Sequence, residues 1–478
     1  MSTSHHESAE NQPGDASEVR PGSDITPAEK TSEPRQAGAV ADSHDTRPAT
    51  TPSRPPRPRT IQLLAVSFAI PLLFDRTVLA GLSSAYGTSR TMSLPFAAFW
   101  LSCVAIVNAL HWRTVRHRPM TWLVTAAIAA LSFWFIASEH GVFSDDPEYG
   151  IITGLCAIPS LLMLHMQLAN GRHDARHPLG IMLRWLTGWL IQPFTGLGRF
   201  GRAVSTTAHA AASGSQRPTM RRIGVALLIS VPLLAVLVAL LASADMVVSY
   251  GISRLFGDLD IASLLMHAFA VLLPMPFLFS LLDNQERSDG EMAALYDKSV
   301  SPSPDTLVTA IVLGLVLAVY AVFCAVQFTF LFAGEGLPGG LTYAEYARSG
   351  FFQLLFVAAT NLAAFGFVLT YAKRTRVITA MPVGLVAATG VMLSSAAMRL
   401  GLYVGTYGLT WLRFASLAFI GLLAVMLALC LVRMRVPRLP LAATCFALFV
   451  VWYVALGYCD PARFVEQYNM AHGFPPLM

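Results

Sequence analysis

A glutamate and an arginine stand three positions apart at the start of a long apolar run, in the stretch LTYAEYARSGFFQLL at residues 341–355. Thr342 and Glu345 match a capping box, in which a hydroxyl and a carboxylate satisfy backbone N–H groups at a helix start. Glu345 and Arg348 also form a favourable i,i+3 pair. By itself, this stretch therefore predicts the beginning of a helix, and its tyrosines suit a membrane interface.

Further charged and aromatic residues fall at similar depth, near the ends of other apolar segments. Asp245 ends its segment, where a carboxylate opposes the helix dipole, and Arg413 begins its segment, where a cation is equally unfavourable. Charges at such positions usually face the protein interior or a wet cavity. We therefore predict a polar cluster in which carboxylates pair with arginines. The predicted cluster consists of Asp75, Arg76, Asp245, Glu345, Arg348, Arg399, Tyr403, Tyr407, Arg413 and Asp460.

The chemistry open to such a cluster is anion binding or acid–base catalysis. Arginines can hold a phosphate or a carboxylate, and Asp75, Asp245 or Glu345 can act as a general acid or base if one of them is unpaired. Two alternatives involve no ligand. In the first, the charges snorkel separately to the membrane interface; in the second, they pair for purely architectural reasons.

Signatures of metals and cofactors are weak. The six cysteines are scattered without a CxxC pair, which argues against a disulfide framework or a zinc site. Met163, His165 and Met166 favour packing over a metal site. The chain has no phosphate-binding loop, zinc-protease motif or nucleophile elbow. We therefore expect no cofactor, no metal, no ATP-driven chemistry and no nucleic-acid partner.

The elements that must position these residues are membrane-spanning helices. The chain has 478 residues, of which 54% are hydrophobic and 13% are charged, about half the charged share of an ordinary soluble domain. Runs of about 20 apolar residues indicate spans. The predicted fold class is all-α, a multi-span transmembrane helix bundle of about eleven spans. They lie near 60–83, 93–111, 119–138, 148–169, 223–244, 261–282, 306–332, 349–372, 376–397, 409–432 and 438–457.

The orientation follows from the basic residues in the loops, because cytoplasmic loops carry an excess of lysine and arginine. If the N-terminus is cytoplasmic, the loops and span ends on the inner side carry 22 basic residues, counted from Arg54 onward, and those on the outer side carry six. We therefore predict a cytoplasmic N-terminus and an extracytoplasmic C-terminus. This orientation places the polar cluster at the outer face.

The predicted organisation has five parts. Residues 1–59 have nine acidic and nine proline residues and no aromatic residue, so this cytoplasmic tail is predicted to be disordered. A first transmembrane group spans 60–170, a cytoplasmic loop spans 171–222, a second transmembrane group spans 223–458, and an extracytoplasmic tail spans 459–478. The loop contains an amphipathic segment at 178–204, which we expect on anionic lipid of the inner leaflet; a peripheral helix packed on the bundle is the alternative. Its apolar and basic residues are Ile181, Trp185 and Trp189, and Arg184, Arg199 and Arg202.

Four stretches carry a resemblance to a known family. They are LLASAD, QFTFLF, LTYAEYARSGFFQLLFVAATNL and SSAAMRLGLYVGTYGLTWLR, which include the motifs YAEYARSGF and RLGLYVGTYGLT. Over roughly residues 220–470 the chain resembles a family of bacterial multi-pass membrane proteins that is defined only as a domain of unknown function. The resemblance implies a bacterial plasma-membrane location and a similar bundle, and it assigns no activity and no catalytic residue.

Three classes of function fit these observations. The first is a carrier or flippase-like protein whose outer cluster receives an anionic or zwitterionic solute or lipid head. The second is a membrane enzyme that acts on envelope lipids or glycans. The third is a non-catalytic envelope or sensing partner, in which the tail and the amphipathic segment contact another membrane protein. The pattern favours the carrier by a small margin.

Overall fold

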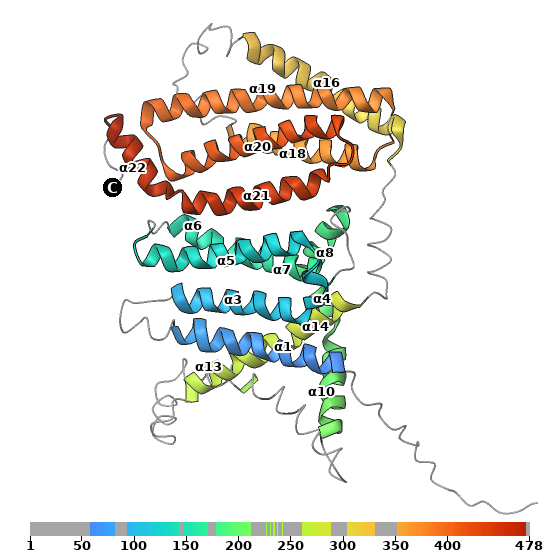
Figure 1. Cartoon of the computed structure of the whole chain (residues 1–478), viewed down its shortest axis with the longest axis vertical. Helices are drawn as coiled ribbons and strands as arrows, with labels where there is room; N and C mark the ends of the chain where they lie inside the picture. Colours follow the sequence, from blue (N-terminus) through green and yellow to red (C-terminus); the bar gives the residue numbers. More distant parts are fainter. Residues whose placement is uncertain are drawn as a thin grey trace, which may run out of the picture. The chain divides into compact units, whose positions relative to one another are not determined.

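The computed structural model describes residues 58–81, 93–142, 147–170, 178–211, 261–287, 304–329, 351–373 and 375–474, with six single positions between 226 and 241. Every regular element within these residues is a helix (Figure 1). The first part contains α1 (Pro58–Phe74), η1 (Asp75–Leu79), α3 (Ser93–Leu110), α4 (Trp112–Val115), α5 (Pro119–Glu139), α6 (Pro147–Ile152), η2 (Thr153–Ala157), α7 (Ile158–Ala169), α8 (Pro178–Leu190), α9 (Gln192–Thr195) and α10 (Leu197–Ala211). The rest contains α13 (Ile261–Leu272), α14 (Pro274–Glu286), α16 (Thr306–Gln327), α18 (Phe351–Tyr371), α19 (Arg376–Tyr407), α20 (Trp411–Arg435), α21 (Leu441–Tyr458) and α22 (Pro461–Ala471).

Ten of the described helical segments are long and apolar enough to cross a membrane. They correspond to ten of the eleven predicted spans, so the prediction of an all-α, multi-pass membrane protein is confirmed. The remaining span, at 223–244, lies mostly outside the described residues, and the total of eleven stays a prediction. The predicted tail at 1–59 also lies outside them, apart from Pro58 and Arg59, which begin α1.

One predicted boundary is wrong. The span at 376–397 was expected to close near Arg399, but α19 continues to Tyr407 and ends at Gly408, which has a φ of 75°. The glycines inside the helix do not break it, and Gly408 ends it with a positive φ that a glycine adopts without strain. Arg399 is therefore an interior residue of α19 and is buried.

Side-chain caps explain several helix starts. Asp305 accepts hydrogen bonds from the N–H groups of Leu307 and Val308 at the start of α16. Thr375 and Thr410 do the same for α19 and α20, where each hydroxyl accepts from the N–H group three residues further on. These bonds satisfy backbone donors that the helix itself cannot satisfy.

The described helices pack in two groups. In the first, α3 packs on α5, α5 on α7, and α1 on α14; in the second, α19 packs on α16, α18 and α20 (Figure 1). Helices α5 and α21 connect the groups. Trp134 Nε1 donates to the carbonyl of Gly457 at 3.1 Å, and the Tyr458 hydroxyl donates to the carbonyl of Ala130 at 2.8 Å.

The amphipathic segment forms α8, α9 and α10, which pack on α7 and α14. Arg199 Nε lies 2.6 Å from a carboxylate oxygen of Asp283 on α14, and Arg184 is buried. Of the three arginines expected to face lipid, Arg202 is the exposed one. Arg184 is thus covered by the protein and Arg199 is paired with Asp283, and whether the segment lies on anionic lipid stays a prediction.

Candidate functional site

The connection from α19 to α20 brings several predicted site residues together. Arg399, Tyr403 and Tyr407 are four residues apart, so they form a stripe along one face of α19. The rings of Tyr403 and Tyr407 are 5.1 Å apart between centroids. Gly408 turns the chain, and Arg413 follows in the first turn of α20. The sequence folds this way because a glycine and a capping threonine stand between two helices.

Arg413 serves the end of α19 rather than the start of its own helix. Its Nη1 donates to the carbonyl of Tyr407 at 3.1 Å and also to the carbonyl of Gly408. Its guanidinium carbon lies 4.2 Å from the centroid of the Tyr403 ring, a cation–π contact. A cation that is unfavourable at the N-terminus of α20 thus compensates the negative C-terminal end of α19.

A pocket of about 370 Å³ opens beside this arginine. Four large apolar side chains line it, and Tyr403, Thr410, Arg413 and Ser416 add polar groups. The apolar lining residues are Phe351, Phe352, Leu400 and Leu412. Within the described part of the chain, Arg413 donates hydrogen bonds from Nη1 alone, so Nε and Nη2 can bind an anion. A planar guanidinium above an apolar pocket suits a phosphate or carboxylate that is attached to a hydrocarbon.

The C-terminal helix α22 holds the connection in place. Asn469 is buried, accepts a hydrogen bond from the N–H of Leu409 at 2.7 Å and donates one to its carbonyl at 2.8 Å. Asp460 has a φ of 49° and caps α22 by accepting from the N–H of Arg463. One of its carboxylate oxygens also lies 3.5 Å from Arg463 Nε. The predicted site residue Asp460 is therefore a helix cap on the neighbouring element.

Asp75 belongs to the first group of helices. It is 3% exposed, and it accepts a hydrogen bond from His267 Nδ1 on α13 at 2.5 Å. Arg76 Nε lies 3.8 Å from the same carboxylate, but the Arg76 side chain is exposed. Asp75 begins η1, a single π-helical turn, and such turns are frequent at functional sites.

The predicted cluster is thus described in part. Tyr403, Tyr407 and Arg413 contact one another, and Arg399 stands on the same face of α19. Asp75 and Arg76 lie on η1, which packs on α1, α3 and α13, whereas α20 packs on α18, α19, α21 and α22. Asp245, Glu345 and Arg348 lie outside the described residues. Whether all ten residues share one site stays a prediction.

Several residues of the site carried no sequence signal strong enough to find them. Asn469 stands in a segment expected to be a tail, and Phe351 and Phe352 look like ordinary span residues. His267 is a polar residue inside a predicted span, and its partner Asp75 is 192 residues away in the sequence. A polar residue inside an apolar run is the one signal that marked it.

The ten apolar helical segments and the arginine pocket between their ends define a helical, multi-pass membrane protein. The chain belongs to the family described as a domain of unknown function (DUF4153), whose model matches residues 123–474. The match begins within α5, so it extends further toward the N-terminus than the resemblance at 220–470. Neither the curated proteins nor the solved structures contain a match to the chain.

Proposed function

We propose that the protein is a carrier of the flippase-like type, which takes an anionic, lipid-like ligand into the pocket at Arg413. The observation that carries the proposal is the Arg413 guanidinium, which is stacked on Tyr403 beside an apolar pocket and donates to described residues through Nη1 alone. A phosphate or carboxylate can accept both remaining donors in a bidentate arrangement. The hydrocarbon part of the ligand then packs on the phenylalanine and leucine side chains.

We place the protein in the bacterial inner membrane with its N-terminus in the cytoplasm. The support for this orientation is the distribution of lysine and arginine from Arg54 onward, with 22 basic residues beside the predicted spans on the inner side and six on the outer side, one of which, Arg399, lies inside α19. In this orientation, the pocket at Arg413 opens near the outer leaflet. A ligand from either the leaflet or the outer solution can then reach it.

The lining of the pocket favours a carrier over an enzyme. Its described residues supply one arginine, hydroxyl groups and apolar side chains, and they include no carboxylate to act as a general acid or base. The carboxylate of Asp75 is hydrogen-bonded to His267. An ionisable pair inside a span is instead suited to bind a coupling proton.

We also propose that the segment 178–204 lies on anionic lipid of the inner leaflet. Exposed apolar side chains on α8 and α9 support this contact, among them Met182 at 57%, Trp189 at 42% and Phe194 at 57% exposure. Arg202 is exposed on α10 and can approach lipid phosphate.

The test of the carrier proposal is a binding measurement on the purified protein in neutral-lipid nanodiscs, with short-chain phosphatidylglycerol and phosphatidylcholine as probes. We expect tighter binding of the anionic probe and a loss of about 10- to 150-fold for Arg413→Gln, which is the value of a hydrogen bond to a charged group. Arg463→Gln is the matched control, because this arginine is exposed and does not line the pocket. Equal affinity of the wild-type protein and Arg413→Gln for both probes would refute the proposal.

A further inference from the structure

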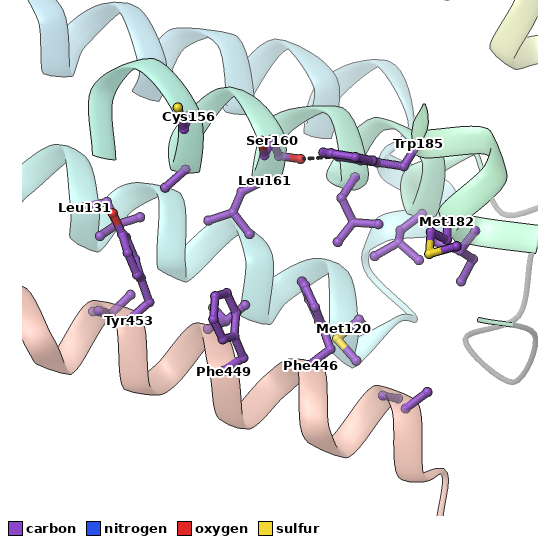
Figure 2. A pocket seen from close by; sticks show the side chains of 18 of the residues that line it. Met120, Leu131, Cys156, Ser160, Leu161, Met182, Trp185, Phe446, Phe449 and Tyr453 are labelled. Carbon is purple, nitrogen blue, oxygen red and sulfur yellow. Dashed lines mark hydrogen bonds between the residues drawn. The ribbon is translucent and has the colours of Figure 1, made fainter. Parts of the chain in front are cut away.

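A second and larger pocket lies in the other part of the described bundle. It has a volume of about 580 Å³ and is formed by α5, α7 and α21, with α8 at one end (Figure 2). Phe446, Phe449 and Tyr453 of α21 point into it from one side, and Leu161 of α7 points into it from another (Figure 2).

The wall is almost entirely apolar, and two of its few polar groups are already paired. The carbonyl of Ser160 accepts a hydrogen bond from Trp185 Nε1 at 3.1 Å (Figure 2). The Tyr453 hydroxyl lies 2.9 Å from the hydroxyl of Thr153. A polar ligand placed here would lose its bonds to water without replacement, so the pocket suits hydrocarbon.

The position of the pocket indicates where that hydrocarbon comes from. Helices α5 and α21, and the segment from α6 to α7, are three of the membrane-length segments, so most of the wall lies at the depth of lipid acyl chains. Ile152 and Phe449 line the pocket and are themselves 45% and 40% exposed. The pocket therefore opens sideways, toward the space that lipid tails occupy in a membrane.

One end of the pocket lies close to basic residues. Met120 and Ala442 line it near the starts of α5 and α21, and they follow Arg118 by two residues and Arg438 by four. Consecutive Cα atoms are about 3.8 Å apart. The Cα atom of Arg118 therefore lies within about 8 Å of that of Met120, and the Cα atom of Arg438 within about 15 Å of that of Ala442. Both helix starts are at the end that α8 covers, where Met182 and Trp185 also line the wall.

We propose that this pocket holds an acyl chain of an anionic phospholipid whose phosphate lies against Arg118 and Arg438. The site is independent of the proposed carrier pocket. Helices α20 and α21 follow each other through a short connection and pack together, so the start of α21 is at the opposite end of the bundle from Arg413. The lipid is a resident one, and it fills the space between the first group of helices and α21.

The experiment uses a phosphatidylglycerol with a photoactivatable group on its acyl chain, added to the full-length protein in nanodiscs. After illumination, mass spectrometry maps the crosslinked peptides. We expect crosslinks concentrated in residues 152–168 and 442–454, and at least tenfold fewer with the same probe built on phosphatidylcholine. Crosslinks spread evenly over all exposed apolar helix faces would overturn the proposal. Equal crosslink yields for the two headgroups would overturn the placement of the lipid phosphate against Arg118 and Arg438. This map needs no substitution, so it does not depend on the folding of a variant.

Two substitutions sharpen the result. Ala443→Trp fills the pocket from α21 and is expected to reduce these crosslinks at least tenfold, whereas Ala424→Trp adds the same bulk on an exposed position of α20 and is expected to leave them unchanged. A double Arg118→Gln, Arg438→Gln variant is expected to lose the preference for the anionic lipid. Arg413→Gln is expected to keep the full yield, which separates failure of this site from failure of the carrier pocket.

Discussion

The amide of Asn469 is expected to hold the arginine pocket in shape, and its removal tests this reasoning quantitatively. Asn469 is 3% exposed and makes two hydrogen bonds, at 2.7 Å and 2.8 Å, to the backbone of Leu409, which is itself 3% exposed. In Asn469→Ala, both Leu409 backbone groups lose their partner in a buried place, at about 1–3 kcal/mol each. We therefore expect the free energy of unfolding to fall by about 2–6 kcal/mol.

Asn469→Asp separates the two bonds. The carboxylate still accepts from the N–H of Leu409, but its second oxygen lies against the Leu409 carbonyl oxygen in a buried place. Because a buried, unpaired charge is costly, the loss should be at least as large as for alanine. The assay is equilibrium unfolding in mixed micelles, followed by tryptophan fluorescence, together with the affinity for short-chain phosphatidylglycerol. Gln467→Ala, an exposed change on the same helix, is expected to stay within about 0.5 kcal/mol. A loss below 1 kcal/mol for Asn469→Ala, with unchanged lipid affinity, would refute the idea that α22 braces the pocket.

Three further predictions concern other parts of the described bundle. Burial, and then the nearby Arg59 guanidinium, lower the pKa of His111 from 6.5 to about 4. As the pH falls below 6.5, His111 takes up a proton in the unfolded chain before it does so in the folded protein. The free energy of unfolding therefore has its full His111 contribution above pH 6.5 and loses it toward pH 4. Unfolding in micelles at two pH values should show about 2 kcal/mol less stability at pH 5 than at pH 7.5, and a His111→Gln variant with the same pH dependence would contradict this origin. Gly408→Ala places a Cβ 2.9 Å from an α22 amide oxygen at a φ of 75°, so it should destabilise by about 1–3 kcal/mol; a variant as stable as the wild type in the same assay would show that the turn adapts. The double variant Asp75→Asn, His267→Gln should lose less free energy of unfolding than the two single variants lose in sum, with a coupling energy of about 1–2 kcal/mol. Additive losses would mean that the pair contributes no interaction energy.

The sequence allowed the prediction of the spans but not of the contacts that organise the site. Apolar length and low charge are local properties, and they fix ten helices to within a few residues in most cases. The partner of Arg413 is a pair of backbone carbonyls on another helix, and no residue type marks such a partner. A cation at the start of a helix was expected to need a partner. Arg413 has one, but the partner is the C-terminal end of α19 and not a carboxylate.

The extra length of α19 explains a second difference. The expected end at residue 397 followed from where the apolar run breaks, before Arg399, but a single charged residue does not stop a helix. The true end is at Gly408, which has a positive φ of 75°, and the next residue, Leu409, is held by Asn469 of α22. Asp75 and His267 could be recognised singly as polar residues inside spans, but their pairing depends on how α1 and α13 pack.

The most direct test of the carrier proposal is lipid movement in proteoliposomes. The vesicles contain acyl-labelled fluorescent phosphatidylglycerol, and dithionite added outside destroys the fluorescence of the outer leaflet only. The proposal predicts that wild-type vesicles continue to lose fluorescence as inner-leaflet lipid is carried outward, whereas Arg413→Gln vesicles keep the protected fraction that protein-free vesicles keep. Wild-type vesicles that protect as much fluorescence as protein-free vesicles would contradict it.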